Sequence, residues 1–286
     1  MHTVSMNGPS LPSVAAQDAR NALAEDVGDG DLTASLIDAD APAQARVLVR
    51  ESAIVCGRPW VEAVLRQLDA RARIEWQVPE GARVSAGDVV LQVRAQARTL
   101  LTAERSMLNF LQLLSGVATR TAQYVQAVQG TRARIVDTRK TIPGLRVAQK
   151  YAVRVGGGCN HRMGLYDGIL IKENHIAAAG SIAAVLQRAH AIAPPGVFVQ
   201  IEVETLDQLE QALAAGARMV LLDNMDLPRL REAVRINAGR AELEVSGGVD
   251  LDTVGALAQT GVDRISVGKL TKDVTATDYS MRFAGV

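Results

Sequence analysis

The chain has 286 residues, and its 31 Lys and Arg are balanced by 31 Asp and Glu, so the formal net charge is zero. This balance argues against a surface built throughout for nucleic acid or an anionic membrane, because both need an excess of positive potential. Aromatic residues make up only 3% of the chain, which leaves little material for stacking on single-stranded nucleic acid. We expect neither nucleic acid nor a membrane as a partner.

Cysteine content and the absence of targeting patterns favour a reduced, cytoplasmic protein. Cys56 and Cys159 form neither a Cys-x-x-Cys motif nor a Cys/His pair, so a zinc site or a disulfide scaffold is not expected. The first twenty residues lack the continuous apolar core of a signal peptide. No run of eighteen apolar residues predicts a membrane-spanning helix.

The first part of the chain alternates short strand and helix patterns. Residues 1–13, rich in Gly, Pro and Ser, predict a flexible start. The following pattern predicts a helix over 15–28, a strand over 45–51, a helix over 57–70, a strand over 73–78 and a small β-layer over 79–96. That last stretch is superficially similar to a biotinyl or lipoyl carrier module. Such modules present a Lys at the hairpin tip, and no Lys precedes Lys140.

A long helix is expected over residues 99–128. Its apolar stripe consists of Leu101, Leu108, Leu111, Leu114 and Val117. Gly116 within it indicates either a break or close packing. We place the domain boundary here, which gives an N-terminal domain over 14–116 and a C-terminal domain over 117–286.

After Gly130 the rhythm becomes strand, helix, strand, helix. The predicted strands are 132–138, 167–173, 197–204, 218–224, 241–247 and 263–269. Such alternation is typical of parallel strands joined by right-handed helical crossovers. Six strands in about 155 residues fall short of the roughly 250 residues of a full eightfold barrel. We therefore predict an open or incomplete α/β barrel.

Polar side chains recur at the ends of the later strands. Glu202, Asp223, Ser246 and Ser266 follow one another at spacings of 21, 23 and 20 residues. In a parallel barrel, active sites are built at the edge formed by the C-terminal ends of the strands. The two acids suit Mg²⁺ or sugar hydroxyls. The alternative is that they only neutralise nearby Lys and Arg.

Positive charge is concentrated between Arg132 and Lys172, where nine basic residues face only Asp137 and Asp167. The nine are Arg132, Arg134, Arg139, Lys140, Arg146, Lys150, Arg154, Arg162 and Lys172. A solvated basic face is the ordinary interpretation of such a run. Here, however, Arg139 and Lys140 follow a buried-type strand, and a Lys that closes an apolar run is costly unless it faces a polar cavity. Bound anions are therefore favoured, with His161 as a further donor beside Arg162.

Two short loops rich in Gly and Ser follow late strands, SGGV at 246–249 and SVGK at 266–269. In barrels, a loop at this position followed by a helix N-terminus is a common phosphate cradle, although such loops also serve as simple turns. Combined with the basic and acidic groups, they predict a site for a phosphorylated sugar and a second anionic substrate.

At this point the sequence resembles the quinolinate phosphoribosyltransferase family, also called carboxylating nicotinate-nucleotide pyrophosphorylases. The motifs are DTRKTIPGLR (137–146), GGGCNHRMGLYDGILIKENH (156–175) and the strand-end residues, and the resemblance extends from EDVGDGDLT (25–33) to the C-terminus. It implies an N-terminal α/β sandwich-like domain, a C-terminal open α/β barrel, and a homodimer whose active sites are completed across the interface. It further implies that quinolinate and phosphoribosyl pyrophosphate give nicotinate mononucleotide, pyrophosphate and CO₂ with Mg²⁺, in de novo NAD biosynthesis.

The resemblance also implies roles for individual residues. The quinolinate pocket would consist of Arg139, His161, Arg162 and Lys172, with Arg105 reaching in from the partner subunit. The phosphoribosyl group would contact Thr138, Arg139, Lys140, Glu202, Asp223, Ser246, Gly247, Gly248, Ser266, Val267 and Gly268. Catalysis would depend on Lys140, Lys172, Glu202 and Asp223, with Glu202 and Asp223 as Mg²⁺ ligands. Glu204 remains an alternative to Glu202.

Three other functions fit parts of the same pattern. The first is a phosphoribosyltransferase that acts on a different pyridine or metabolite acid. The second is a barrel lyase that forms a Schiff base on Lys172. The third is a non-catalytic protein that binds a phosphosugar. The substrate order and any assembly larger than a dimer stay open.

Overall fold

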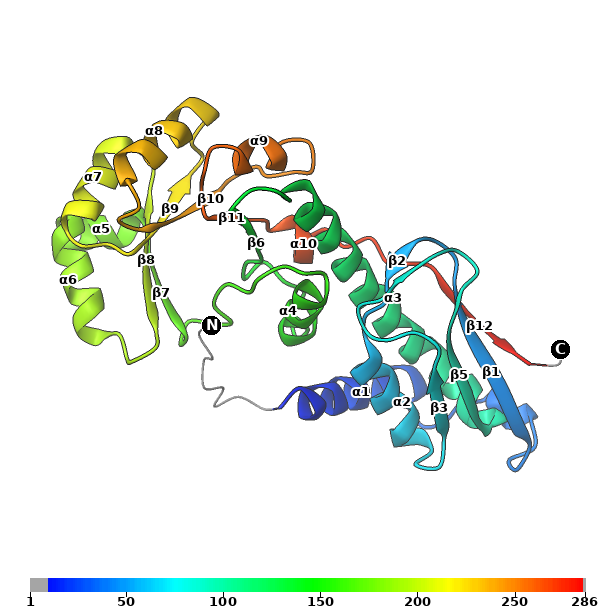
Figure 1. Ribbon diagram of the computed structural model, residues 1–286. Helices are drawn as coiled ribbons and strands as arrows, with labels where there is room; N and C mark the ends of the chain where they lie inside the picture. The colour runs from blue at the N-terminus through cyan, green and yellow to red at the C-terminus, as the bar shows by residue number, and fades with distance from the viewer. Residues whose placement is uncertain (1–9, 285–286) are drawn as a thin grey trace. The chain divides into compact units, whose positions relative to one another are not determined.

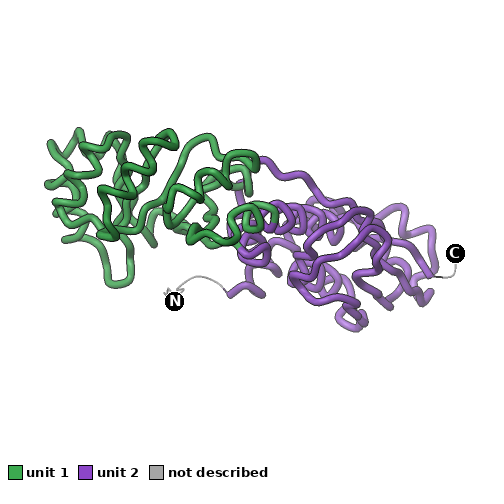
Figure 2. Tube along the Cα trace, turned by 45° about the horizontal axis from the view of Figure 1, so that its top comes forward, with its two compact units in different colours: residues 1–5, 123–141, 158–272 green, residues 6–122, 142–157, 273–286 purple. Residues whose placement is uncertain are grey.

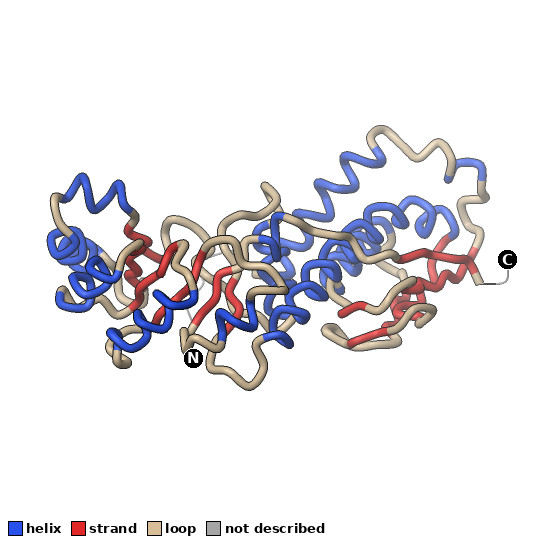
Figure 3. The backbone as a smooth tube through the Cα atoms, turned by 90° about the horizontal axis from the view of Figure 1, so that it is seen from above, coloured by secondary structure: helices blue, strands red, loops and turns tan. Residues whose placement is uncertain are grey.

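The computed structural model describes residues 10–284 and contains both helices and strands throughout (Figures 1 and 3). Within these residues the chain forms two compact units, coloured separately in Figure 2. Unit 1 comprises residues 123–141 and 158–272, and unit 2 comprises residues 10–122, 142–157 and 273–284. Each unit is therefore built from separated segments of chain. The sequence-based boundary at residue 116 stays a prediction about folding domains.

Unit 1 is organised around a parallel sheet of six strands. Their order is β6 (Arg134–Val136), β11 (Arg264–Ser266), β10 (Glu242–Ser246), β9 (Met219–Asp223), β8 (Phe198–Val203) and β7 (Gly168–Ile171). Strand β6, the first strand of this unit in sequence, pairs with β11, the last, as in a barrel. Strands β6 and β7 lie at the two opposite ends of the sheet order. This order confirms the predicted α/β class with parallel strands, and all six predicted strands are present with shorter ends.

Helices connect the strands of unit 1 from β7 to β11, and one more follows β11. They are α5 (Glu173–Ala179), α6 (Ile182–Ile192), α7 (Leu206–Ala214), α8 (Leu227–Asn237), α9 (Val254–Ala258) and α10 (Lys269–Lys272). Ser181, Thr205 and Asp226 begin three of them, because each side chain accepts a hydrogen bond from a backbone N–H of the first turn. Helices α6, α7 and α8 lie along one side of strands β7 to β9 (Figure 1).

Unit 2 contains an antiparallel sheet in the order β12 (Tyr279–Phe283), β1 (Pro42–Val49), β5 (Val89–Gln96) and β3 (Arg73–Trp76). Strand β2 (Ala53–Ile54) pairs separately with β4 (Arg83–Val84). The edge strand β12 comes from the end of the chain and extends from Val49↔Tyr279 to Ala45↔Phe283 in register. The N-terminal sheet is therefore completed by residues that the sequence analysis placed in the C-terminal domain.

The helices of unit 2 are α1 (Leu11–Val27), the short 3₁₀ helix η1 (Ala34–Leu36), α2 (Arg58–Leu68) and α4 (Arg146–Val155), together with most of α3 (Ala97–Ala127). Helix α1 begins four residues earlier than predicted, because Ser10 caps it through a hydrogen bond from the Ser13 N–H. Residues 11–13 are thus helical instead of part of a flexible start, and residues 1–9 lie outside the described residues. No helix within 10–284 is both long and apolar enough to cross a membrane.

Helix α3 packs through small and hydroxyl residues. Gly116 does not break the helix, and a Cβ at this position would overlap the Thr275 carbonyl oxygen. Of the two expectations for Gly116, the structure therefore shows close packing. Next to it, the buried Ser115 hydroxyl accepts from the Cys56 N–H at 3.0 Å and lies 3.1 Å from the Tyr279 hydroxyl. These contacts attach β12 and the start of α2 to the same turn of α3.

Candidate active site

The C-terminal ends of the parallel strands bring together residues that are far apart in sequence. Lys172 directly follows β7, and its Nζ lies 2.9 and 3.2 Å from the two carboxylate oxygens of Glu202 on β8. On the next pair of strands, Asp223 and Ser246 are register partners. One edge of the sheet therefore presents a base and two acids on three consecutive strands, as the strand-end spacing predicts.

Glu202 and Glu204 occupy different environments. The Glu202 side chain is only 10% exposed and contacts Lys172. Glu204 lies beyond the end of β8 and is exposed, and its backbone N–H donates to the Gln208 side chain at 2.7 Å. Glu202, and not Glu204, therefore belongs to the cluster at the strand ends.

Thr138, Lys140 and Gly268 lie together beyond the ends of β6 and β11. The Thr138 hydroxyl accepts from the Lys140 N–H at 3.0 Å, and the Thr271 hydroxyl donates to the Lys140 carbonyl at 2.8 Å. A Cβ at Gly268 would lie 3.3 Å from the Lys140 side chain and 3.7 Å from the Thr138 hydroxyl. This glycine thus keeps backbone accessible beside a lysine, an arrangement suited to a phosphate group.

A second glycine loop follows β10. Gly247 and Gly248 have φ angles of 103° and 61°, in the region that favours glycine. A Cβ at Gly247 would overlap the Asn224 side-chain oxygen. Asn224 also donates from Nδ2 to Asp223 at 2.8 Å and from its backbone N–H to the Ser246 carbonyl at 3.1 Å. Asn224 thus joins the loops after β9 and β10 and orients the Asp223 carboxylate, a role that sequence reasoning missed.

Arg139 and Arg162 form a pair of like charges. The Arg162 Nη1 donates to the Gly168 carbonyl at 2.9 Å, and both arginine side chains are partly buried. Burial, and next the positive charge of Arg139, lower the pKa of the Arg162 guanidinium, whereas Asp167 acts in the opposite direction. The positive charge of both guanidiniums favours an anion at this place, and their planar donor groups match carboxylates.

The loop that carries His161 and Arg162 is fixed by a buried acid. Asp137 accepts from the His161 N–H at 2.8 Å and from the Asn160 side chain at 2.6 Å, and it is completely buried. The adjacent Cys159 forms a parallel bridge with Val136 at the end of β6. One of the two acids in the basic segment therefore shapes the backbone of the anion site.

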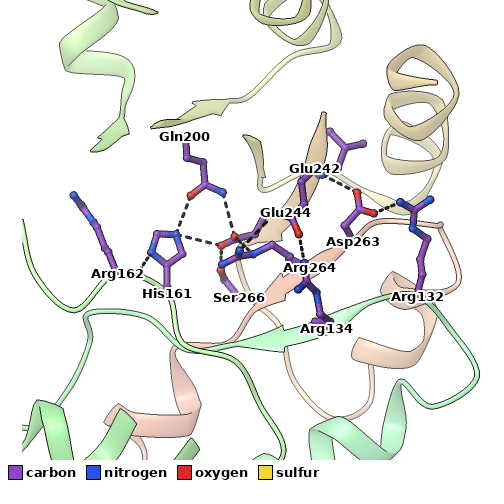
Figure 4. Close-up of polar contacts among 11 residues, drawn as sticks. Arg132, Arg134, His161, Arg162, Gln200, Glu242, Glu244, Asp263, Arg264 and Ser266 are labelled. Carbon is purple, nitrogen blue, oxygen red and sulfur yellow. Dashed lines mark hydrogen bonds and ion pairs between the residues drawn. The ribbon is translucent and has the colours of Figure 1, made fainter. Parts of the chain in front are cut away.

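Several residues of the basic segment lie elsewhere. Arg132 pairs with Asp263 and Arg134 with Glu242, at the starts of strands β10 and β11 (Figure 4). Arg146, Lys150 and Arg154 lie on α4 in unit 2, where Lys150 is almost completely buried. Arg105 is also in unit 2, exposed on α3. The positive charge of the segment is therefore divided between the two units, and part of it is paired with acids.

Ser266 has a partner that the sequence did not suggest. Its hydroxyl donates to Glu244 on β10, and the N–H of Val267 donates to the Val136 carbonyl at 2.9 Å. Ser266 itself is only 7% exposed. The phosphate roles of Ser266 and Val267 stay predictions, while the geometry around Gly268 supports a role for that glycine.

Comparisons with known proteins cover both parts of the chain. Residues 31–115 match the N-terminal domain, and residues 117–282 the C-terminal domain, of a family described as quinolinate phosphoribosyl transferase. A carboxylating nicotinate-nucleotide pyrophosphorylase of Mycobacterium leprae is 44% identical over 92% of this chain and 94% of its own length. A decarboxylating quinolinate phosphoribosyltransferase of Nicotiana glauca is 38% identical over 91% of this chain and 80% of its own length. The solved nicotinate-nucleotide pyrophosphorylase of Francisella tularensis superimposes with a TM-score of 0.94 at 43% identity, covering 98% of this chain and 99% of that one.

Proposed function

Because the chain belongs to the quinolinate phosphoribosyltransferase family, we propose that the strand-end cluster of unit 1 transfers a phosphoribosyl group to quinolinate. The products are nicotinate mononucleotide, pyrophosphate and CO₂. The observation that carries the assignment to this site is the set of charged groups at the strand ends, where Glu202 holds the Lys172 ammonium at 2.9 Å and the positive charge of Arg139 acts on the Arg162 guanidinium. Quinolinate carries two adjacent carboxylates, whose negative charges complement the positive charges of these side chains.

The dicarboxylate and the sugar phosphate are assigned to different groups. Arg139, Arg162 and Lys172 bind the carboxylates of quinolinate, with His161 beside them. Lys140, Thr138 and Gly268 bind phosphate at the ends of β6 and β11, where backbone and side chain lie close together. Gly247 and Gly248 form the second phosphate loop after Ser246. Glu202 and Asp223 accept hydrogen bonds from the ribose hydroxyls.

Transfer begins when the bond between ribose C1 and the pyrophosphate oxygen breaks. The electron pair leaves with pyrophosphate, and the ribose ring gains oxocarbenium character as in glycoside cleavage. Lys140 stabilises the charge on the departing oxygen, while the arginines hold the pyridine nitrogen in line with C1. The nitrogen lone pair then forms the new bond to C1. No covalent bond to the protein is needed.

Loss of CO₂ follows from the positive charge on the ring nitrogen. The bond between C2 and its carboxylate breaks, and the electron pair stays on C2, where the adjacent pyridinium nitrogen stabilises it. The carbon then takes a proton from water, which gives nicotinate mononucleotide. Lys172, held by Glu202 at 2.9 Å, keeps a fixed positive charge at the end of β7 throughout.

The acids of this site suit Mg²⁺ that binds together with the phosphates of the substrate. Among residues 10–284, no three His, Cys, Asp or Glu side chains form a group that would hold a metal by themselves. Glu202 and Asp223 lie on neighbouring strands, and Mg²⁺ is commonly bound by one or two carboxylates together with substrate phosphates. These two residues would hold the ion, which neutralises pyrophosphate charge when bound.

The proposal includes a homodimer with shared active sites. Arg105, which is exposed on α3, supplies a further cation to the quinolinate pocket of the second subunit. The exposed Leu165 and Tyr166 lie in the loop that separates Arg162 from β7. Large apolar side chains at 74% and 79% exposure next to the anion site support contact with a second chain.

A product assay tests the reaction. Purified protein is incubated with quinolinate, phosphoribosyl pyrophosphate and Mg²⁺, and nicotinate mononucleotide and CO₂ are measured. Both should form in equal amounts, and omission of Mg²⁺ or addition of a chelator should lower the rate. Turnover of nicotinate in place of quinolinate, without CO₂, would instead support a transferase for another pyridine. An adduct trapped on Lys172 by borohydride would support the lyase, and absence of any turnover would leave only a binding protein.

A further inference from the structure

A chain of polar contacts leads from the anion site into the interior of unit 1 (Figure 4). The Arg162 backbone N–H donates to His161 Nδ1 at 2.8 Å, and His161 Nε2 lies 2.8 Å from Gln200 Oε1 on β8. Gln200 Nε2 in turn donates to Glu244 Oε2 on β10 at 3.1 Å. Gln200 and Glu244 are completely buried, and His161 is 9% exposed. The chain thus crosses from the loop before β7 to the middle of the sheet.

Glu244 determines the direction of the hydrogen bonds in this chain. Its Oε2 lies 2.8 Å from the Nε of Arg264, and its Oε1 accepts from the Ser266 hydroxyl. An ionised carboxylate only accepts, so the NH₂ group of Gln200 faces Glu244 and the Gln200 oxygen faces His161. His161 Nε2 is 3.8 Å from Glu244 Oε1, too far for a direct hydrogen bond. Because Glu244 only accepts hydrogen bonds, Gln200 donates to it and presents its own oxygen as an acceptor to the imidazole of His161.

The same logic fixes the proton on His161. The Gln200 oxygen accepts, so Nε2 carries the hydrogen, and the Arg162 N–H donates, so Nδ1 carries none. A proton on Nδ1 would point at the Arg162 N–H. Each ring nitrogen is thus used within the protein, and His161 is held as the neutral Nε2–H tautomer. Phe198 supports the ring with an edge contact whose centroids are 5.3 Å apart.

We propose that Gln200 and Glu244 are positioning residues for quinolinate binding: they hold His161 in one tautomer, and His161 fixes the Arg162 backbone instead of donating to a substrate carboxylate. This proposal rests on the proposed function, and it changes the role that the family resemblance implies for His161. The imidazole contacts the Arg162 backbone and not the substrate. The buried acid on β10 therefore influences a substrate that it does not touch.

Nitrogen NMR of protein labelled with ¹⁵N-histidine tests the tautomer without any turnover. The chain has four histidines, and the His161 signals are identified by their loss in His161→Gln. The proposal expects Nε2–H with unprotonated Nδ1 in the free protein and the same pattern with bound quinolinate. Appearance of the imidazolium form, or of an Nδ1–H, when quinolinate binds would mean that His161 donates to the substrate and would overturn the proposal.

Kinetics of matched variants test the consequence. Gln200→Leu should raise the KM for quinolinate about tenfold, because His161 loses the buried hydrogen bond that orients it, while the KM for phosphoribosyl pyrophosphate changes less than about twofold. Glu244→Leu should act like Gln200→Leu. Glu244→Gln keeps an oxygen that can accept from Gln200 and should retain most of the quinolinate affinity. Equal loss for both substrates in Gln200→Leu would contradict a positioning role.

Two control variants separate a positioning effect from a general effect of substitution. Gln259→Leu replaces an exposed glutamine of the same unit and should leave both KM values unchanged. Glu232→Gln removes the ion-pair partner of Arg235 on α8, outside this chain of contacts, so it should leave both KM values and the His161 tautomer unchanged. If wild-type protein forms no nicotinate mononucleotide, the proposed function fails. The NMR pattern in the free protein is then still measured, so the two failures are distinguishable.

Discussion

Lys172 combines two properties that a substrate-binding lysine needs. Its Nζ is held by both oxygens of Glu202, yet 47% of its side chain remains exposed. The contact fixes the direction of the ammonium group, and the exposure leaves it open to a ligand. A lysine with neither property would be a solvated surface charge, the alternative that the sequence alone leaves open.

Lys172→Ala should lower kcat/KM for quinolinate by about 100-fold, the loss typical of removing one preorganised charged donor. Stability should hardly change, because a partly exposed ion pair contributes only about 0–1 kcal/mol. Steady-state kinetics and a thermal melt measure the two effects. Arg231→Ala removes an exposed cation from α8 and serves as the control. Near-normal kinetics of Lys172→Ala would contradict the assignment of the quinolinate pocket.

For residues of the parallel sheet, the sequence predicts which side chains share a face but not which side chains they contact. The alternation in VFVQIEVE correctly assigns Gln200 and Glu202 to one face. The same alternation in AELEVSG places Glu244 on a face opposite Leu243 and Val245, which was a usable signal for a buried acid. Its partners were not predictable, because Arg264 and Ser266 come from another strand and meet Glu244 only through sheet register.

Secondary structure was predicted well where periodicity is local. Helix α3 and all six parallel strands lie within a few residues of their predicted ranges. Strand β12 was missed, because the TDYSMRF stretch owes its extended conformation to pairing with β1, more than 200 residues away in sequence. Ends were also imprecise, as at α1, where the Ser10 cap and not the apolar pattern determines the first turn.

Gly116→Ala tests the close packing of α3. An added Cβ would overlap the Thr275 carbonyl oxygen, so the segment before β12 must shift. We expect the free energy of unfolding to fall by about 1–3 kcal/mol. The cost of the overlap is larger than the gain of about 1 kcal/mol that Ala brings in helix propensity. Urea denaturation measures it. Gly255→Ala in α9 is the matched control, because its nearest contact would be an ordinary 3.6 Å, and it should not destabilise. Equal stability of the two variants would show that the 275 segment adapts freely.

At the scale of the whole molecule, neutrality hides an uneven distribution of charge. Residues 132–172 hold nine basic and two acidic groups, which leaves 22 against 29 for the remaining chain. The structure divides this segment further, since Arg132 and Arg134 pair with acids and α4 belongs to unit 2. The cations of this segment that we propose for substrate, Arg139, Lys140, Arg162 and Lys172, all belong to unit 1. The order of residues in the sequence predicted the local excess, and the fold shows which of these cations pair with acids or belong to unit 2.

Mixing two inactive variants tests whether active sites are shared between subunits. Arg105→Ala and Lys172→Ala damage the same site from different chains if Arg105 acts across the dimer. Random heterodimers then contain one intact site, so a co-expressed mixture should recover about a quarter of wild-type activity. Differently tagged subunits allow the heterodimers to be purified and assayed. Isolated heterodimers without activity would show that both residues serve one chain, and Arg105→Ala mixed with itself is the control.

The pairing of β12 with β1 has a consequence for synthesis on the ribosome. Strands β1, β3 and β5 emerge early, but the edge of their sheet is filled only by residues 279–283, which are synthesised after all of unit 1. The part of the protein that is translated first is therefore finished last, against the usual order in which N-terminal domains fold first. Until β12 has been synthesised, the free edge of β1 is open to pairing with other nascent chains. A stop codon between residues 272 and 279 would thus leave the parallel sheet complete and the N-terminal sheet without its edge strand β12.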